Sequence, residues 1–129
     1  MKAPIKAIDA ILFQPVGVVV DEAGEPYPDA ASAIAELDTL GVKLIELPSA
    51  SAAALREAVS AAELAVDRVI YLTDNEAGIR AAKEAGVAPV LMMNDPDEAM
   101  RLTAFDPAGG IVSLLELPDF VRFVSMGQQ

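Results

Sequence analysis

Five short apolar runs alternate along this chain with segments of helical spacing. We expect strands at five places, which are residues 7–13, 42–47, 68–73, 89–93 and 111–112. Several of these runs are apolar throughout instead of alternating with polar residues, namely 11–13, 69–72 and 90–93. Uninterrupted apolar runs are typical of parallel strands that are covered on both faces. The pattern therefore predicts an α/β fold in which a parallel sheet lies between two layers of helices.

The segment between the first two strands combines a flap and a helix. Residues 14–28 hold a short β-prone run, a turn signal at 22–24 and two prolines before the helix, which favours a small β-flap after strand one. Pro28 and Asp29 suit a helix start, and Gly41 suits a helix end. The apolar face that we expect to point inward is formed by Ile34, Leu37 and Leu40.

The next two helices also have recognisable boundary residues. The second is expected to begin near Ser49 or Ser51 and the third at Asp74 or Asn75, because these side chains cap the first backbone N–H groups of helices. Gly86 is expected to end the third helix. The spacing of apolar residues predicts the inward faces, which are Leu55, Val59 and Ala62 in the second helix and Ile79, Ala82 and Ala85 in the third.

The last two helices begin with capping sequences. Asp95 is expected to cap a helix whose first residue is Pro96, and Ser113 is expected to cap the final helix together with Glu116. Asp95 and Asp97 also have the spacing of metal ligands. The chemistry of a helix start explains both residues, so we expect no metal there.

The composition excludes several kinds of catalytic chemistry. The 129 residues are the length of one domain, 1–129, and the hydrophobic fraction of 53% is ample for a core. The chain has no cysteine, which removes disulfides, thiolate metal sites and cysteine nucleophiles and fits a reducing, cytoplasmic compartment. It also has no histidine, which removes histidine-based triads and imidazole bases.

The charge of the chain limits its partners. A net charge of −11 repels phosphate backbones, so we expect no nucleic acid partner. No apolar run approaches the roughly 20 residues that a membrane-spanning helix needs, so we expect no membrane partner. A homodimer, an unidentified protein partner and a small-molecule ligand all remain open.

Several stretches of the sequence carry a resemblance to a known family. Residues 9–21 read DAILFQPVGVVVD and residues 71–87 read YLTDNEAGIRAAKEAGV. They resemble the first and fourth motifs of the haloacid-dehalogenase-like (HAD) phosphohydrolases, in which the first strand runs into Phe-Asp-x-Asp-Gly-Val and a flap. Residues 28–44, 95–99 and 113–118 are similar to other segments of the family in the same order. The resemblance covers nearly the whole chain and implies a three-layer, Rossmann-like HAD fold.

The resemblance also implies where catalytic residues would lie. In the family, the first Asp of motif one is the nucleophile that forms an aspartyl-phosphate, and an Asp two residues later is the general acid and base. The matching positions here are Gln14 and Val16. A Gln amide cannot form the acyl-phosphate, and a Val side chain has no proton to give. We therefore expect the family's catalysis to be lost, and the chain not to be an enzyme.

The other motif positions are also incomplete. Pro48 stands where the family has a Ser or Thr that holds the phosphoryl group, and Ser49 comes one residue late. No Lys occurs between residues 49 and 67, where the family has a phosphate-binding Lys, and only Arg56 offers a cation. Asp74 matches an acidic magnesium ligand of the family. A single carboxylate holds Mg²⁺ weakly, so we expect no cofactor or at most a weak Mg²⁺ site at Asp74.

A ligand crevice is expected at one edge of the sheet. The chain is too short for the strand and helix that the family has between its second and fourth motifs, which leaves the strand order 2-1-3-4-5. Such a sheet has a crevice beyond the carboxyl ends of its first and third strands. The residues expected to line it are Gln14, Pro15, Val16, Ser49, Thr73, Asp74 and Asn75. An alternative interpretation is that Gln14 and Val16 have replaced the family's residues without gaining a role of their own. Asp74 also fits the N-cap of a helix.

Three functions fit these observations. The leading hypothesis is a non-catalytic HAD-like domain that acts as a binding or assembly module. The second is a weak or altered magnesium-dependent phosphohydrolase that recruits Asp21 or Asp74 in place of the lost nucleophile. The third is a pseudo-receiver-like signalling domain. It fits the size and the strand order, but not the flap or the lack of an acidic pair after strand one.

Overall fold

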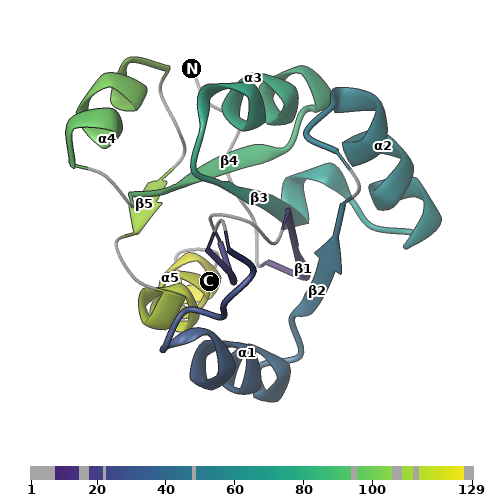
Figure 1. Ribbon diagram of the computed structural model, residues 1–129. Coiled ribbons are helices and arrows are strands. Elements are labelled where there is room, and N and C mark those ends of the chain that lie inside the picture. Colours follow the sequence, from purple (N-terminus) through teal and green to yellow (C-terminus); the bar gives the residue numbers. More distant parts are fainter. Residues whose placement is uncertain are drawn as a thin grey trace.

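The structure of the protein is a computed structural model that describes residues 8–14, 18–21, 23–47, 49–93, 96–105, 109–111 and 114–126, without the side chains of 96, 98, 99 and 122–126. Its strands are β1 (Ala10–Phe13), β2 (Lys43–Glu46), β3 (Val69–Thr73), β4 (Ala88–Met92) and β5 (Gly109–Ile111). Its α-helices are α1 (Ala30–Thr39), α2 (Ala52–Ala61), α3 (Glu76–Ala85), α4 (Pro96–Leu102) and α5 (Leu117–Met126) (Figure 1). Short 3₁₀ turns are η1 (Val66–Arg68), η2 (Thr103–Phe105) and η3 (Leu114–Glu116).

The strands form one parallel sheet in the order β2-β1-β3-β4-β5, which confirms the predicted order. β1 lies between β2 and β3, and Phe13 at its end pairs with Glu46 on one side and Leu72 on the other. These three strands therefore end near one another, and the residues that follow them meet at one edge of the sheet, here called the carboxyl edge. A parallel α/β sheet leaves room for a ligand at such an edge.

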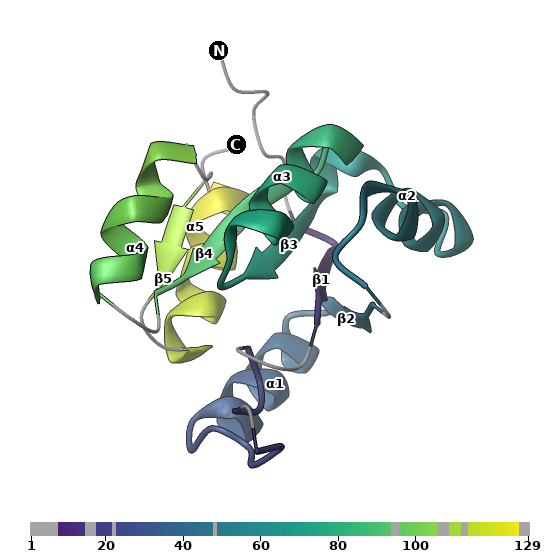
Figure 2. The ribbon, with the colours of Figure 1, turned by 45° about the horizontal axis from the view of Figure 1, so that its top comes forward.

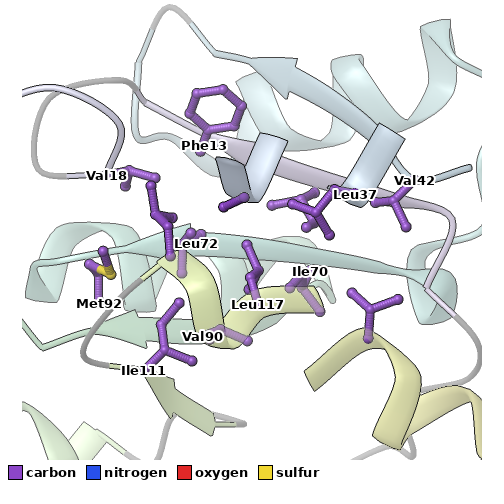
Figure 3. Close-up of a cluster of buried hydrophobic side chains, with 14 of the residues drawn as sticks. Phe13, Val18, Leu37, Val42, Ile70, Leu72, Val90, Met92, Ile111 and Leu117 are labelled. Atoms are coloured by element: carbon purple, nitrogen blue, oxygen red, sulfur yellow. The ribbon is translucent and has the colours of Figure 1, made fainter. Parts of the chain in front are cut away.

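Two helical layers cover the sheet, as the apolar runs predict. Helices α1 and α5 lie on one face, and α2, α3 and α4 lie on the other (Figures 1 and 2). The layer under α1 and α5 is the larger one and includes Phe13, Leu37, Ile70, Leu72, Val90 and Leu117 (Figure 3). The opposite layer includes Leu12, Leu55, Val59, Tyr71 and Ala82 under α2 and α3, with Ile79, Leu91 and Leu102 beside α4. Each fully buried Leu or Ile contributes about 1.5–3 kcal/mol to stability. In the described part of the chain, no helix is both long and apolar enough to cross a membrane.

Helix α1 turns different residues inward from those expected. Ala30, Ala33 and Leu37 are buried, whereas Ile34 and Leu40 are 38% and 37% exposed. The two alanines have small side chains and form one stripe with Leu37, so the helix sits close to the sheet along that stripe and its larger neighbours stay at the rim. Leu40 is the C-cap, beyond the last helical turn. The inward prediction is confirmed for Leu37 and wrong for Ile34 and Leu40.

The predicted β-flap is present as a small hairpin between β1 and α1. Val20 and Pro26 form an antiparallel bridge. The turn between them is held by Asp21, whose Oδ1 accepts hydrogen bonds from the backbone N–H groups of Ala23 at 2.9 Å and Glu25 at 3.0 Å. Such a turn is a common structural use of Asp. The carboxylate of Asp21 is therefore engaged in shaping the flap.

The final helices begin close to the predicted positions. α4 starts at Pro96 as expected, while Asp95 and Ser113, the expected caps of the last two helices, lie outside the described residues. The final α-helix starts later than predicted, at Leu117, because the 3₁₀ turn η3 occupies the preceding three residues. Pro118 then falls in the first helical turn, where its missing N–H is not needed.

Three helices end in a turn that requires a positive φ. This angle is +78° at Gly41 after α1 and +82° at Gly86 after α3, and both glycines were predicted helix ends. The corresponding residue after α2 is Glu63, with a φ of +55°. The N–H of Leu64 donates to the Val59 carbonyl oxygen at 2.9 Å, which is the hydrogen bond of a Schellman turn. A residue with a Cβ is strained in this conformation, so Glu63 is a local weakness.

Replacing Glu63 by glycine should stabilise the protein. We expect E63G to raise the free energy of unfolding by about 0.5–1 kcal/mol, because relief of the Cβ strain exceeds the extra chain entropy that glycine adds to the unfolded state. Denaturant unfolding measures this difference. E63A is the matched control, since it removes the same charge but keeps the Cβ, and it should give no gain. An equal gain in both variants would trace the effect to charge and contradict the backbone explanation.

Candidate functional site

The carboxyl edge brings together residues that the sequence predicts for one crevice. Gln14 directly follows β1 and is half-buried, and Asp74 and Asn75 directly follow β3. The last residue of β1 pairs with the penultimate residue of β3, so Gln14 stands beside Thr73, the end of β3, in the register of the sheet. The residues that end these two neighbouring strands therefore lie next to each other at the centre of this edge.

A further polar group comes from the segment after β2. Ser49 is exposed, and its hydroxyl lies 3.2 Å from the hydroxyl of Ser51, which caps α2. The predicted start of α2 is thereby confirmed at Ser51. Pro15 and Val16, predicted for the crevice, and Pro48, at the family's phosphoryl-binding position, lie outside the described residues. Of the residues predicted to line the crevice, the structure therefore describes Gln14, Ser49 and the three at the end of β3, and the crevice itself stays a prediction.

Thr73 supports the crevice and does not present its side chain to it. The residue is only 3% exposed, and the first turn of α3 lies directly over it. A Cβ built on Gly78 would lie 1.9 Å from the Oγ1 atom of Thr73, far inside van der Waals contact. Glycine at position 78 therefore lets α3 approach the end of β3 closely, and this contact fixes where the helix begins.

Asn75, and not Asp74, caps α3. The Oδ1 atom of Asn75 accepts a hydrogen bond from the N–H of Gly78 at 2.9 Å, and its Nδ2 donates to Oδ1 of Asp74 at 2.9 Å. The interpretation of Asp74 as the helix cap is therefore wrong, because the contact between the helix and β3 places the cap one residue later. The Asp74 carboxylate is left at the carboxyl edge, where the amide of its neighbour orients it.

Tyr71 on β3 adds a polar group that sequence reasoning assigned only to the core. The residue is 1% exposed and lies in the layer under α2 and α3, with Leu12 and Leu55. Burial, together with the negative charge of Asp74, raises the pKa of Tyr71 to about 12. The phenol is therefore neutral at pH 7 and keeps its proton for donation to a hydrogen bond.

Asp74 is the candidate metal ligand of this site. Among the described residues, no three acidic groups come together in a way that could hold a metal ion. Asp97 on α4 is exposed, and Asp95 lies outside the described residues. Mg²⁺ needs several oxygen ligands in near-ideal geometry, usually with one or two carboxylates and a substrate phosphate. One carboxylate supplies only a small part of such a set of ligands, so the weak Mg²⁺ site at Asp74 stays a prediction.

A cluster beside the crevice was not predicted from the sequence. Glu76, the first residue of α3, accepts hydrogen bonds from Nε of Arg80 at 2.6 Å and from Nη1 of Arg101 on α4 at 3.2 Å. The Arg80 guanidinium also lies 5.0 Å from the ring centroid of Phe105 in η2. Hydrogen bonds from Arg101 and then Arg80 lower the pKa of Glu76. The spacing of four residues between Glu76 and Arg80 was readable in the sequence, whereas the Arg101 contact needs the tertiary structure.

An apolar hollow lies on the other face of the sheet, under α1, the flap and η3. Its volume is about 20 Å³, roughly the space of one water molecule. The residues that line it are all apolar and include Ile11, Val18, Leu37, Leu44, Leu72 and Leu117. The hollow is part of the larger core layer and offers a ligand no polar group.

No family model matches the chain, and no curated protein matches it in sequence. Solved structures do match it. The cobalt-bound form of the deoxy-D-mannose-octulosonate 8-phosphate phosphatase (YrbI) from Haemophilus influenzae superposes with a TM-score of 0.70 and 12% sequence identity, over 95% of this chain and 91% of that chain.

Two further structures give the same picture. A YrbI family phosphatase from Pseudomonas syringae superposes with a TM-score of 0.65 and 14% identity, over 95% of this chain and 89% of that chain. A HAD family hydrolase from Streptomyces avermitilis superposes with a TM-score of 0.63 and 13% identity, over 98% of this chain and 90% of that chain. Identities this low establish likeness of fold alone. The parallel sheet, its two helical layers and the flap of this chain form a HAD-like fold.

Proposed function

We propose that this chain is a HAD-fold binding module that forms no phosphoenzyme. The observation that carries the proposal is Gln14 in the first position after β1, at the centre of the carboxyl edge. By the resemblance of residues 9–21 to the family's first motif, this is the place of the nucleophilic Asp. An amide is a poor nucleophile and cannot take up a phosphoryl group as an acyl-phosphate.

Three of the described side chains that could act in place of the lost motif residues are engaged in other contacts. Both hydrogen bonds at Oδ1 of Asp21 hold the turn of the flap. The two guanidinium groups near the start of α3, those of Arg80 and Arg101, are engaged with Glu76. Phosphoryl transfer depends on positioned groups that stabilise the charge of the transferred phosphate. The side chains described here are suited to holding a ligand and not to this stabilisation.

The proposed role is reversible binding at the carboxyl edge, of either a small molecule or a segment of a protein partner. Gln14, Asp74 and Asn75 offer hydrogen-bond donors and acceptors with one negative charge among them. The net charge of −11 disfavours polyanionic ligands. An assembly role, with a second copy of the chain as the partner, is an alternative within the same proposal.

A second candidate function is a weak magnesium-dependent phosphohydrolase. One observation favours it: Asp74 is not the cap of α3, so its carboxylate stays at the carboxyl edge, where a cation would bind. The phosphatases among the structural neighbours make this alternative worth testing. It would require a water molecule to attack the phosphoryl group without a covalent intermediate, because Gln14 supplies no nucleophile.

Phosphate release distinguishes the two functions. We expect the purified chain with Mg²⁺ to release phosphate from p-nitrophenyl phosphate at the rate of the buffer blank, because both carboxyl groups of the catalytic motif are replaced. The variant D74A should give the same rate. Turnover above the blank that D74A abolishes would establish the phosphohydrolase and refute the proposal.

A second test compares the chain with a variant that regains the two carboxyl groups of the family's motif. The double variant Q14D/V16D restores the two carboxyl groups of the family's motif in an otherwise unchanged chain. Beryllium fluoride with Mg²⁺ mimics a phosphoryl group on an aspartate, so it should raise the melting temperature of this variant and leave that of the natural chain unchanged. Stabilisation of the natural chain by beryllium fluoride would contradict the proposal.

A further inference from the structure

The apolar hollow under α1 reaches the surface between that helix and the flap. Ile11 and Leu72 line it from the strands, and the flap, α1, η3 and α5 supply its outer walls. Three of its lining residues are not fully covered: Ile34 on α1 is 38% exposed, and Val19 in the flap and Leu44 on the edge strand β2 are half-buried. The flap lies beside the start of α1 (Figure 2). The hollow therefore has an apolar rim that is partly open to solvent.

The surface around this rim carries charge of one sign. Residues 7–42 contain no lysine or arginine, and neither does η3. The described acidic residues of the flap and α1 are Asp21, Glu25, Asp29, Glu36 and Asp38. Asp38 follows Ile34 by one helical turn, and residues four apart are neighbours on a helix surface. Carboxylates of the flap and of α1 therefore border the apolar rim.

The nearest basic residues do not change the sign of this surface. Lys43 is the first basic residue after the acidic segment, but the adjacent Leu44 lines the hollow. Neighbouring side chains of a strand point to opposite faces of the sheet, so that of Lys43 points away from the hollow. In the opposite helical layer, the guanidinium groups of Arg80 and Arg101 form hydrogen bonds with Glu76.

The size of the hollow and the charge around it select the kind of partner. The hollow holds about one methyl group, which is close to a water molecule in size. Burial of one such group strengthens binding only about fourfold, so the hollow alone does not hold a small apolar molecule. A cationic partner gains attraction from the surrounding carboxylates, whereas nucleic acids and anionic lipids are repelled. A second copy of the chain carries the same net charge of −11 and is repelled too.

We propose that the flap and α1 form a docking surface for a basic segment of a partner protein. The segment inserts one aliphatic side chain into the hollow, and its lysines or arginines lie over the acidic residues of the flap and α1. The surface includes none of Gln14, Asp74 and Asn75. The inference therefore goes beyond the proposed function and does not depend on it.

A synthetic peptide of this chemistry tests the proposal. The acetylated and amidated peptide KKLKK is titrated at low ionic strength into the chain carrying ¹³C-labelled Ile, Leu and Val methyl groups. We expect saturable shifts of the methyl signals of Val18, Ile34 and Leu114, which line the hollow, and none of Leu55 and Val59 in the opposite layer. The peptide KKSKK, which lacks the aliphatic side chain, should bind about fourfold more weakly. Added salt should weaken the binding of both peptides, because it screens the charges.

Charge variants test the acidic part of the surface. The double variant E25Q/D38N removes two exposed charges beside the hollow, and we expect it to bind KKLKK about 3–10-fold more weakly. The matched control is E57Q/E84Q, which removes two exposed charges from α2 and α3 in the opposite layer. It should bind the peptide within about twofold of the natural chain. Equal weakening in both double variants would trace the effect to net charge and contradict the proposed surface.

A third variant tests the apolar part. I34S removes the aliphatic side chain from the rim, so its preference for KKLKK over KKSKK should fall below about twofold. V66S is the matched control, because Val66 is 43% exposed in η1 and does not line the hollow. This control should keep the preference of the natural chain. Thermal melting of both variants checks that they fold, and the ratio of the two affinities is independent of a small unfolded fraction.

Three results would overturn the inference. The first is the absence of a saturable shift at the hollow with KKLKK. The second is equal binding of KKLKK and KKSKK to the natural chain, which would show attraction to charge without an apolar anchor. The third is a dimer in sedimentation experiments that I34S abolishes, which would assign the surface to a second copy. None of these results changes the proposed function, whose tests are phosphate release and beryllium fluoride binding.

Discussion

The contact between Gly78 and Thr73 fixes the geometry of the carboxyl edge. Because a Cβ at position 78 would lie 1.9 Å from the Thr73 hydroxyl oxygen, only glycine allows α3 to lie so close to the end of β3. The close approach puts the helix cap at Asn75 and leaves Asp74 at the edge of the sheet. It also brings α3 over Tyr71, so the candidate site depends on one backbone-to-side-chain packing contact.

Electrostatics at this edge differ from those of a phosphate-binding site. The described cations nearest the start of α3 are held by Glu76, and that ion-pair cluster connects α3 to α4. Exposed ion pairs of this kind add little to stability, because water and salt screen them. Among the described residues that follow β1, β2 and β3, Gln14 and Asn75 carry amides, Ser49 a hydroxyl and Asp74 a carboxylate. They form hydrogen bonds readily, but they do not offset the charge of a phosphate.

Much of the fold was predictable, because its signals are local. Apolar runs marked all five strands to within a few residues, and Gly41 and Gly86 marked two helix ends. The inward face of α1 was not predictable from hydrophobicity. Ala30 and Ala33 pack against the sheet because their small side chains allow a close approach. The more hydrophobic Ile34 stays partly exposed at the edge of this contact. At the site, the sequence indicated Gln14, Ser49 and Asp74, but it gave no reason to single out Tyr71.

The sequence by itself determined the approximate positions of the strands, the flap and the chemical identity of Gln14 after β1, because each of these is set by residues adjacent in the chain. The order of the strands in the sheet was predicted only through the resemblance to the HAD family. The tertiary structure decided which of two neighbouring residues caps α3, since Asp74 and Asn75 have nearly equal capping propensity and only the Thr73–Gly78 contact separates them. It also decided the pairing of Arg101 with Glu76 and the raised pKa of Tyr71. The first depends on a contact between residues 25 positions apart, and the second depends on burial in the folded chain. Neither can be read from the local sequence.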